Sequence, residues 1–380
     1  MKKVGASGLL PAGLRDGLPP EAEWEAHVIE RLMAGFAGHG YRRVKPPLIE
    51  FEDTLLAGPG QSLAPHMFRL MDPISQRMLG VRPDMTLQVA RIAETRLRDV
   101  ARPLRLSYAG QVLRVRGSQL RPERQFAQAG AEIIGTEALG ADLEVILMAA
   151  EALAELGVRH VSVDLTQPLL APALCQGLGL DEERARDARR ALDQKDVAAL
   201  RQAAGPAAST LEALMAAAGP AEQAVAQLAR LPLPPPAADM AAELSDLVGR
   251  LRRAAPDLML TADPGEFRGL EYQTGISFTF FARGVRGELG RGGRYLSGGE
   301  SCTGITLYLD SILRALPPAD GMRRIYLPPD CPLAKARRLR AEGWCTVQGF
   351  ENVGDPAGEA RRLGCTHHLA DGEIREVGLA

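Results

Sequence analysis

The 380-residue sequence predicts an α+β protein, an antiparallel sheet flanked by helices, with a helical insertion and a small C-terminal α/β appendage. Two runs of alternating apolar and polar residues, 104–115 and 125–134, are joined by a polar, arginine-rich loop and predict an antiparallel hairpin. Residues 167–255 show helical spacing without a strand-like run. Residues 323–380 alternate short strands with helices, which predicts a separate α/β module.

The segment before the hairpin predicts one helix and one strand. Residues 20–38 form an amphipathic helix, because their apolar residues recur every four positions and share one stripe. That stripe consists of Trp24, Val28, Leu32 and Phe36. Residues 41–51 resemble a strand, and the paired prolines within it restrict it to an edge, a bulge or a strand start.

The segment after the hairpin predicts further elements in chain order. They are a helix at 139–156, a strand at 158–165, a proline-rich linker at 231–236, strands at 271–281 and 287–289, and a helix at 304–316. The glycine-rich stretch 287–299 is interpreted as a turn rather than a dinucleotide-binding loop. In the appendage we expect strands at 325–327, 345–348 and 367–370, and helices at 332–342 and 355–363.

Composition excludes several classes of protein. The 45 Lys and Arg residues nearly balance the 47 Asp and Glu residues, which argues against a chain that mainly neutralises phosphates. The five cysteines are scattered without a C-x-x-C pair, so the sequence indicates neither a disulfide framework nor a zinc site. We therefore expect the protein to work in the reducing cytoplasm. No apolar run reaches membrane-spanning length, and no metal or cofactor motif is present, so we expect neither a membrane span nor a cofactor.

A set of polar residues lies on segments predicted to be strands or turns. Its members are Asp84, Thr86, Arg114, Gln128, Glu132, Arg268, Glu271 and Tyr272. Gln128 and Glu132 share the face of their strand opposite a row of alanines, so that face is free to hold a ligand. A satisfied hydrogen-bond network in an open sheet explains the same spacing equally well.

Six motifs occur in an order that resembles histidyl-tRNA synthetase. They are Gly40-Tyr41 through Pro46-Pro47-Leu48-Ile49-Glu50, Arg82-Pro83-Asp84-Met85-Thr86, Tyr108 through Leu113-Arg114, Arg124 through Glu132, Arg268-Gly269-Leu270-Glu271-Tyr272, and Gly292-Gly293-Arg294-Tyr295. The resemblance spans most of residues 8–316. It implies the class II aminoacyl-tRNA synthetase fold at 1–166 and 263–318, with the insertion at 167–262 and the appendage at 319–380. It also implies a homodimer formed around the first motif.

The resemblance implies a site for an amino acid like histidine. Asp84 beside Thr86 would hold the α-amino group, Arg114 would pair with the carboxylate, and Gln128 and Glu132 would reach the ammonium and the imidazole. Arg268 and Tyr272 belong to the same implied site. A zwitterion suits this set, because each ligand charge needs an opposite partner once water leaves. Gln273 replaces the family's second tyrosine, which loosens the expected imidazole specificity.

The departures from the synthetase pattern concern ATP. Ser311 stands where the resemblance places an arginine that clamps the γ-phosphate, and Tyr308 stands where it places a glycine. Arg116 replaces a glutamate expected near adenine. Because a serine hydroxyl cannot make a charge-assisted bidentate phosphate contact, we expect a degenerate ATP site without catalytic residues.

The departures together are similar to the family of ATP phosphoribosyltransferase regulatory subunits. Residues 323–380 are also too few and too nearly neutral for the usual anticodon-binding domain, so no tRNA is expected as a partner. The resemblance implies a non-catalytic subunit in a hetero-oligomer with the short-form catalytic subunit, required for the first step of histidine biosynthesis. Histidine is the implied feedback inhibitor. The alternatives are an active amino-acid-activating enzyme with unusual ATP contacts, and a scaffold with an empty pocket.

Overall fold

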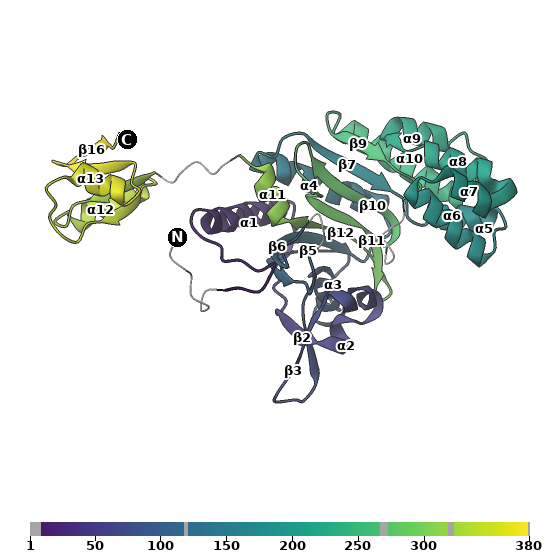
Figure 1. The fold of residues 1–380 in the computed structure, drawn as a ribbon, viewed down its shortest axis with the longest axis horizontal. Helices are drawn as coiled ribbons and strands as arrows, with labels where there is room; N and C mark the ends of the chain where they lie inside the picture. The colour runs from purple at the N-terminus through teal and green to yellow at the C-terminus, as the bar shows by residue number, and fades with distance from the viewer. Residues whose placement is uncertain (1–8, 118–120, 267–272, 318–322, 379–380) are drawn as a thin grey trace. The chain divides into compact units, whose positions relative to one another are not determined.

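A nine-stranded, mostly antiparallel sheet forms the centre of the larger part of the chain (Figure 1). In sheet order the strands are β1 (Arg42–Arg43), β5 (Leu104–Leu113), β6 (Gln125–Ile134), β12 (Glu300–Tyr308), β11 (Gly290–Ser297), β10 (Gln273–Ala282), β7 (Val161–Thr166), β9 (Met259–Ala262) and β8 (Gly219–Pro220). Only the pairs β1–β5 and β7–β9 are parallel. The computed structural model describes residues 9–117, 121–266, 273–317 and 323–378, which divide into compact units on either side of the 317/318 boundary.

The predicted hairpin is confirmed as β5 and β6, with Leu104 opposite Ile134 and Leu113 opposite Gln125. The alternation along β6 sends its side chains into two cores. On one face, Ala127, Ala129, Ala131 and Ile133 pack into the main core. That face is covered by α1 (Glu21–Gly38) and α4 (Leu139–Leu156), which confirms both predicted helices. The opposite face is covered by α3 (Thr86–Thr95).

Two predictions are wrong in the second half of the sheet. Residues 304–308, predicted as the start of a helix, belong to β12, and only Leu309–Ala315 form the helix α11. The stretch predicted as a turn at 287–299, with a short strand at 287–289, contains the strand β11 instead. Its glycines are required by close packing, because a Cβ at Gly292 would lie 2.2 Å from the carbonyl oxygen of Gly304.

The insertion is helical as predicted, apart from a short contribution to the sheet. Its helices are α5 (Leu170–Gly177), α6 (Glu182–Gln194), α7 (Val197–Ala204), α8 (Ala208–Ala216), α9 (Ala221–Leu228) and α10 (Ala237–Ala254), with a 3₁₀ turn at Gly205–Ala207. The expectation that no strand interrupts residues 167–255 is wrong at β8, which pairs with β9 at the edge of the sheet. Two residues carry too little periodicity to be recognised as a strand.

The predicted strand at 41–51 is divided into two strands in different sheets, and the predicted edge position is confirmed for β1. β1 joins the main sheet, whereas β2 (Ile49–Phe51) joins β4 (Met78–Val81) and β3 (Phe68–Met71) in a small antiparallel sheet. The helix α2 (Glu52–Leu55) and a 3₁₀ helix at Gly58–His66 follow β2. The paired prolines lie between β1 and β2, and Arg82 fixes them by donating a hydrogen bond of 3.0 Å to the carbonyl oxygen of Pro46.

The C-terminal unit is an α/β module with a sheet of its own. Its strands are β14 (Cys345–Gln348), β13 (Arg324–Leu327), β15 (His367–Ala370) and β16 (Glu373–Glu376), in that order. The helices α12 (Leu333–Ala341) and α13 (Pro356–Arg362) pack against Ile325 and Tyr326 on opposite faces, which confirms the predicted alternation. β16, which is exposed throughout, was not predicted. Among the described residues, no helix combines the length and the apolar character that crossing a membrane requires.

Candidate functional site

The candidate site lies on the face of the main sheet that α3 covers. Directly opposite residues of antiparallel strands point to the same face, so the register defines rows of side chains. Two such rows cross β6, β12 and β11: Gly130, Thr306 and Arg291; Glu132, Gly304 and Gly293. A third row, Gln128 and Tyr308, crosses β6 and β12. The glycines create the space in these rows, because a Cβ at Gly304 would lie 1.8 Å from Oε2 of Glu132.

Glu132 is the central acid of this face and is only 1% exposed. Its two carboxyl oxygens accept hydrogen bonds from the hydroxyls of Tyr108 (3.1 Å) and Tyr295 (3.0 Å). Burial raises the pKa of Glu132 to about 8, because the loss of water outweighs these bonds, and the nearby Asp84 raises it further. Glu132 therefore carries a proton at neutral pH in the unliganded protein.

Hydroxyl groups connect Glu132 to the start of α3. The hydroxyl of Tyr108 lies 2.9 Å from Oγ1 of Thr306 and 3.1 Å from Oγ1 of Thr86. Asp84 accepts a bond of 2.8 Å from the backbone N–H of Thr86 and one of 3.0 Å from Nε2 of Gln128. The structure thus brings together four of the residues predicted from the sequence.

The cavity beside these groups, here called the Glu132 cavity, is small. It is lined by Thr86, Glu132, Gln273, Arg291, Gly292, Gly293, Tyr295, Gly304, Ile305 and Thr306. Its volume of about 20 Å³ has room for one water molecule. Two buried amide oxygens near it, Oε1 of Gln128 and Oε1 of Gln273, accept no hydrogen bond from the described residues. A larger ligand therefore finds acceptors prepared for its N–H groups but must move side chains to enter.

The remaining predicted ligand residues either do not line the cavity or are not among the described residues. Arg114 follows β5, and its Nε donates a long hydrogen bond of 3.3 Å to the carbonyl oxygen of Pro83. Its guanidinium lies 5.2 Å from the ring centre of Phe126. Arg268 and Tyr272 fall in 267–272, outside the described residues.

The residues assigned to a degenerate ATP site occupy a region closed by internal contacts. Ser311 is fully buried and accepts hydrogen bonds from Arg314 (3.0 Å) and Arg121 (3.4 Å). Arg121 also forms a 3.0 Å ion pair with Asp310 and stacks 3.9 Å from the ring centre of Tyr308. Protein groups thus occupy the place where the resemblance puts a triphosphate.

Arg116, the third residue of that assignment, is exposed beyond the end of β5. It is separate from the closed arrangement around Tyr308.

Sequence reasoning missed several residues that the fold brings to this face. They are Tyr108, Thr306, Arg291, Tyr295 and Arg121. Thr306 was hidden by the incorrect helix prediction. Tyr108 and Tyr295 stood inside recognised motifs, and an aromatic hydroxyl on the same strand face as an acid is the signal that could have identified them.

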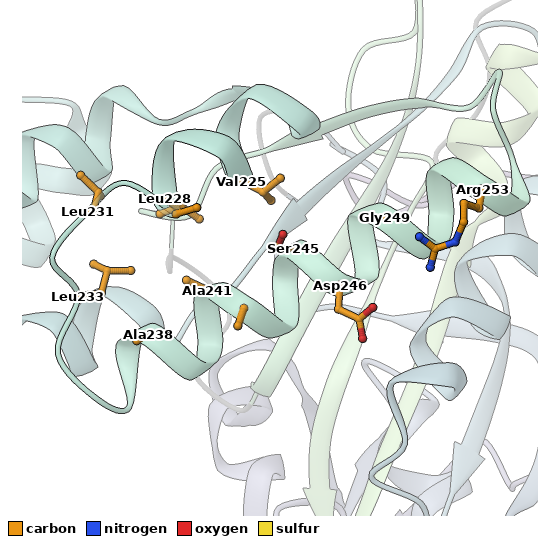
Figure 2. A pocket seen from close by; sticks show the side chains of 12 residues that line it. Val225, Leu228, Leu231, Leu233, Ala238, Ala241, Ser245, Asp246, Gly249 and Arg253 are labelled. Atoms are coloured by element: carbon orange, nitrogen blue, oxygen red, sulfur yellow. The ribbon is translucent and has the colours of Figure 1, made fainter.

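A larger cavity of about 550 Å³ lies in the insertion, between α9, the proline-rich linker and α10 (Figure 2). Figure 2 shows aliphatic side chains along most of it, with Asp246 and Arg253 towards one end. Asp246 already forms an ion pair of 2.7 Å with Arg250. This cavity contains none of the predicted site residues and suits a zwitterion poorly.

The described residues contain no group of three or more His, Cys, Asp and Glu side chains arranged to hold a metal ion. All five cysteines are free, and Cys175, Cys302 and Cys365 are buried. Burial raises the pKa of the Cys302 thiol to about 12, so it stays protonated.

Comparison with known proteins places the fold and the family. A family model described as histidyl-tRNA synthetase matches residues 13–312. The solved structure of an ATP phosphoribosyltransferase regulatory subunit/histidyl-tRNA synthetase from Bacillus halodurans is 25% identical, with a TM-score of 0.81 over 93% of this chain and 96% of its own. Histidyl-tRNA synthetase from Nostoc shares the fold, with a TM-score of 0.80 at 18% identity over 98% of this chain and 97% of its own.

Relatives with high sequence identity to this chain are regulatory subunits. The ATP phosphoribosyltransferase regulatory subunit of Rhodospirillum centenum is 59% identical over 97% of this chain and 96% of its own. That of Paramagnetospirillum magneticum is 55% identical over 99% of this chain and 100% of its own. The class II synthetase fold predicted from the motifs is confirmed. The chain belongs to the family of ATP phosphoribosyltransferase regulatory subunits.

Proposed function

We propose that this chain is a regulatory, non-catalytic subunit that associates with the short-form catalytic subunit of ATP phosphoribosyltransferase, and that histidine bound at the Glu132 cavity controls the complex. The regulatory role rests on family membership. The complex performs the first step of histidine biosynthesis, so histidine acts as an end-product inhibitor. The observation that carries the choice of ligand is the hydrogen-bonded proximity of Asp84, Thr86, Gln128 and Glu132 beside a small cavity that Thr86 and Glu132 line.

The polar groups of the cavity suit an amino acid with a second N–H donor. Burying an amide oxygen without a partner costs free energy, and the oxygens of Gln128 and Gln273 are in that condition. An ammonium group and an imidazole N–H supply the missing donors. Glu132 becomes ionised when a cation lies beside it, because an opposite charge stabilises the carboxylate.

The closed ATP region supports a role without amino-acid activation. A nucleotide there would have to displace the ion pair between Arg121 and Asp310 and the stacking on Tyr308. It would find Ser311 where a phosphate clamp is needed. The small size of the Glu132 cavity means that histidine binds a rearranged state. Histidine then shifts the equilibrium between the two states by no more than its differential affinity for them.

The assembly and location follow the same reasoning. The chain forms a homodimer around the Pro46–Pro47 region within a hetero-oligomer, and it works in the cytoplasm without binding tRNA. The synthetase-like domain comprises 1–166 and 263–318, interrupted by the insertion at 167–262 and followed by the C-terminal domain at 319–380.

Reconstitution with the short catalytic subunit tests the proposal. Transferase activity is measured for the catalytic chain alone, for the mixture, and for the mixture with histidine, while size-exclusion chromatography reports association. We expect association, activation on mixing and inhibition by histidine. If the chains do not associate and the activity is unchanged, the proposal is wrong. Histidine-dependent exchange of pyrophosphate into ATP by this chain would also overturn it.

The site assignment needs its own variant. Glu132→Ala should weaken histidine binding roughly tenfold or more in a calorimetric titration, since a charged hydrogen-bond partner contributes about 1.5–3 kcal/mol. Glu144→Ala is the matched control, because Glu144 also accepts a hydrogen bond from a tyrosine, Tyr41, but lies outside the cavity. Equal loss in both variants would assign Glu132 a structural role.

A further inference from the structure

Arg291 is the feature of the Glu132 cavity that neither the motifs nor the resemblance assigns. It lies on β11 directly opposite Thr306 and lines the cavity. Its Nε is buried and has no hydrogen-bond partner, and no ion pair joins it to any residue in the described part of the chain. A desolvated guanidinium N–H without an acceptor costs free energy that a bound anion recovers.

None of the described carboxylates forms an ion pair with Arg291. Both oxygens of Asp84 already accept hydrogen bonds, from Thr86 and Gln128. Glu266 interacts with Arg291 only at longer range: the arginine lowers the pKa of Glu266, but burial raises that pKa more. Glu132 is protonated at neutral pH and brings no negative charge. Arg291 therefore has unused capacity for an anion at the cavity.

The position of Arg291 relative to Glu132 fits the two ends of an amino acid. The rows that contain them are about 6.8 Å apart along the strands, and the two residues lie on β6 and β11, the strands on either side of β12, so their side chains reach the cavity from different strands. Arg114, by contrast, does not line the cavity, and its Nε is already directed to the carbonyl oxygen of Pro83.

We propose that Arg291 binds the carboxylate of the amino-acid ligand, the contact that the synthetase resemblance assigns to Arg114. The inference rests on the proposed function, since it needs an amino acid in the Glu132 cavity. A guanidinium is suited to this contact because its planar donors match a carboxylate in a bidentate arrangement. Arg291 then determines specificity: it selects ligands that carry a carboxylate beside the ammonium group.

Calorimetric titration of the full chain with histidine and with histidinol tests the assignment. Histidinol keeps the ammonium group and the imidazole but lacks the carboxylate. We expect wild type to prefer histidine, and we expect Arg291→Gln to lose roughly tenfold or more in histidine affinity. Histidinol affinity should stay within about twofold, because the lost contact involves only the carboxylate. Arg291→Lys, which keeps a positive charge, should recover part of the preference.

Control variants separate the possible outcomes. Arg283→Gln makes the same change at an exposed position after β10 and should alter neither affinity. If wild type does not bind histidine, the proposed function fails. If wild type binds it and Arg291→Gln keeps the preference over histidinol, or if the preference disappears in Arg114→Gln instead, the assignment to Arg291 is wrong. Loss of both ligands in Arg291→Gln would also overturn it, because Arg291 would then be structural.

Discussion

The proton on Glu132 leads to a quantitative prediction about stability and pH. In the folded chain the pKa of this carboxyl is about 8, whereas an unfolded glutamate titrates near 4.5. Between these values the folded state binds more protons than the unfolded state, so stability is complete below pH 4.5 and falls as the pH rises towards 8. Each pH unit in this window removes up to about 1.4 kcal/mol. Glu132→Gln, which resembles the protonated form, should remove this slope.

Urea unfolding at pH 5, 7 and 9 measures the effect. Trp24 packs against the main core and Trp344 lies in the C-terminal unit, so a Trp344→Phe background leaves one tryptophan that reports on the larger unit. We expect Glu132→Gln to match its parent at pH 5 and to exceed it by several kcal/mol at pH 9, as the slope of about 1.4 kcal/mol per pH unit requires. Stability curves that remain parallel across this range would refute the buried-acid reasoning.

Glu144 provides a control of opposite sign. Arg105 lowers the pKa of Glu144, so its contribution to stability is present above the unfolded pKa and is lost as the pH falls through the folded pKa. Glu144→Gln should therefore reduce stability at neutral pH and lose this effect in acid.

Three further predictions concern ligand binding and packing. Histidine binding at pH 7 should release about one proton, because Glu132 ionises when the ligand binds. Proton release makes the calorimetric heat of binding depend on the ionisation enthalpy of the buffer, so identical heats in different buffers would contradict this prediction. Gly304→Ala should abolish histidine binding and lower the melting temperature, because its Cβ would overlap Oε2 of Glu132; unchanged titrations would mean that the cavity is not the site. Asp310→Asn should cost about 3 kcal/mol in urea unfolding, because the buried Arg121 loses its 3.0 Å ion pair; no loss would show that the ion pair contributes nothing.

The elements that the sequence predicted well have strong periodicity of their own. The helices α1 and α4 carry long apolar stripes, and the hairpin β5–β6 alternates over ten residues in each strand. The strands β11 and β12 were not predicted correctly, and the reasons are physical. Glycine has low strand propensity, yet β11 needs it for close packing, and the apolar run that ends β12 is too short to separate a strand from a helix.

The site could be predicted only in part. Spacing showed that Gln128 and Glu132 share a face, but only the motif resemblance connected them with Asp84 and Thr86, about forty residues earlier. Arg291 could not be predicted, since its place in the cavity depends on the register between β11 and β12. The closure around Tyr308 depends on Arg121, whose loop carries no periodicity, and on an ion pair across the fold.

The tightness of the Glu132 cavity has a mechanical consequence. Its lining comes from α3, β6, β10, β11 and β12, and alternate residues of β6 pack on the far side of the sheet against α1 and α4. Close-packed interiors have low compressibility and pass strain on to their neighbours. A ligand that enlarges the cavity displaces these strands, and the helices packed on the other face of the sheet must then move as well. The sheet therefore transmits ligand binding from the cavity to the opposite surface of the domain.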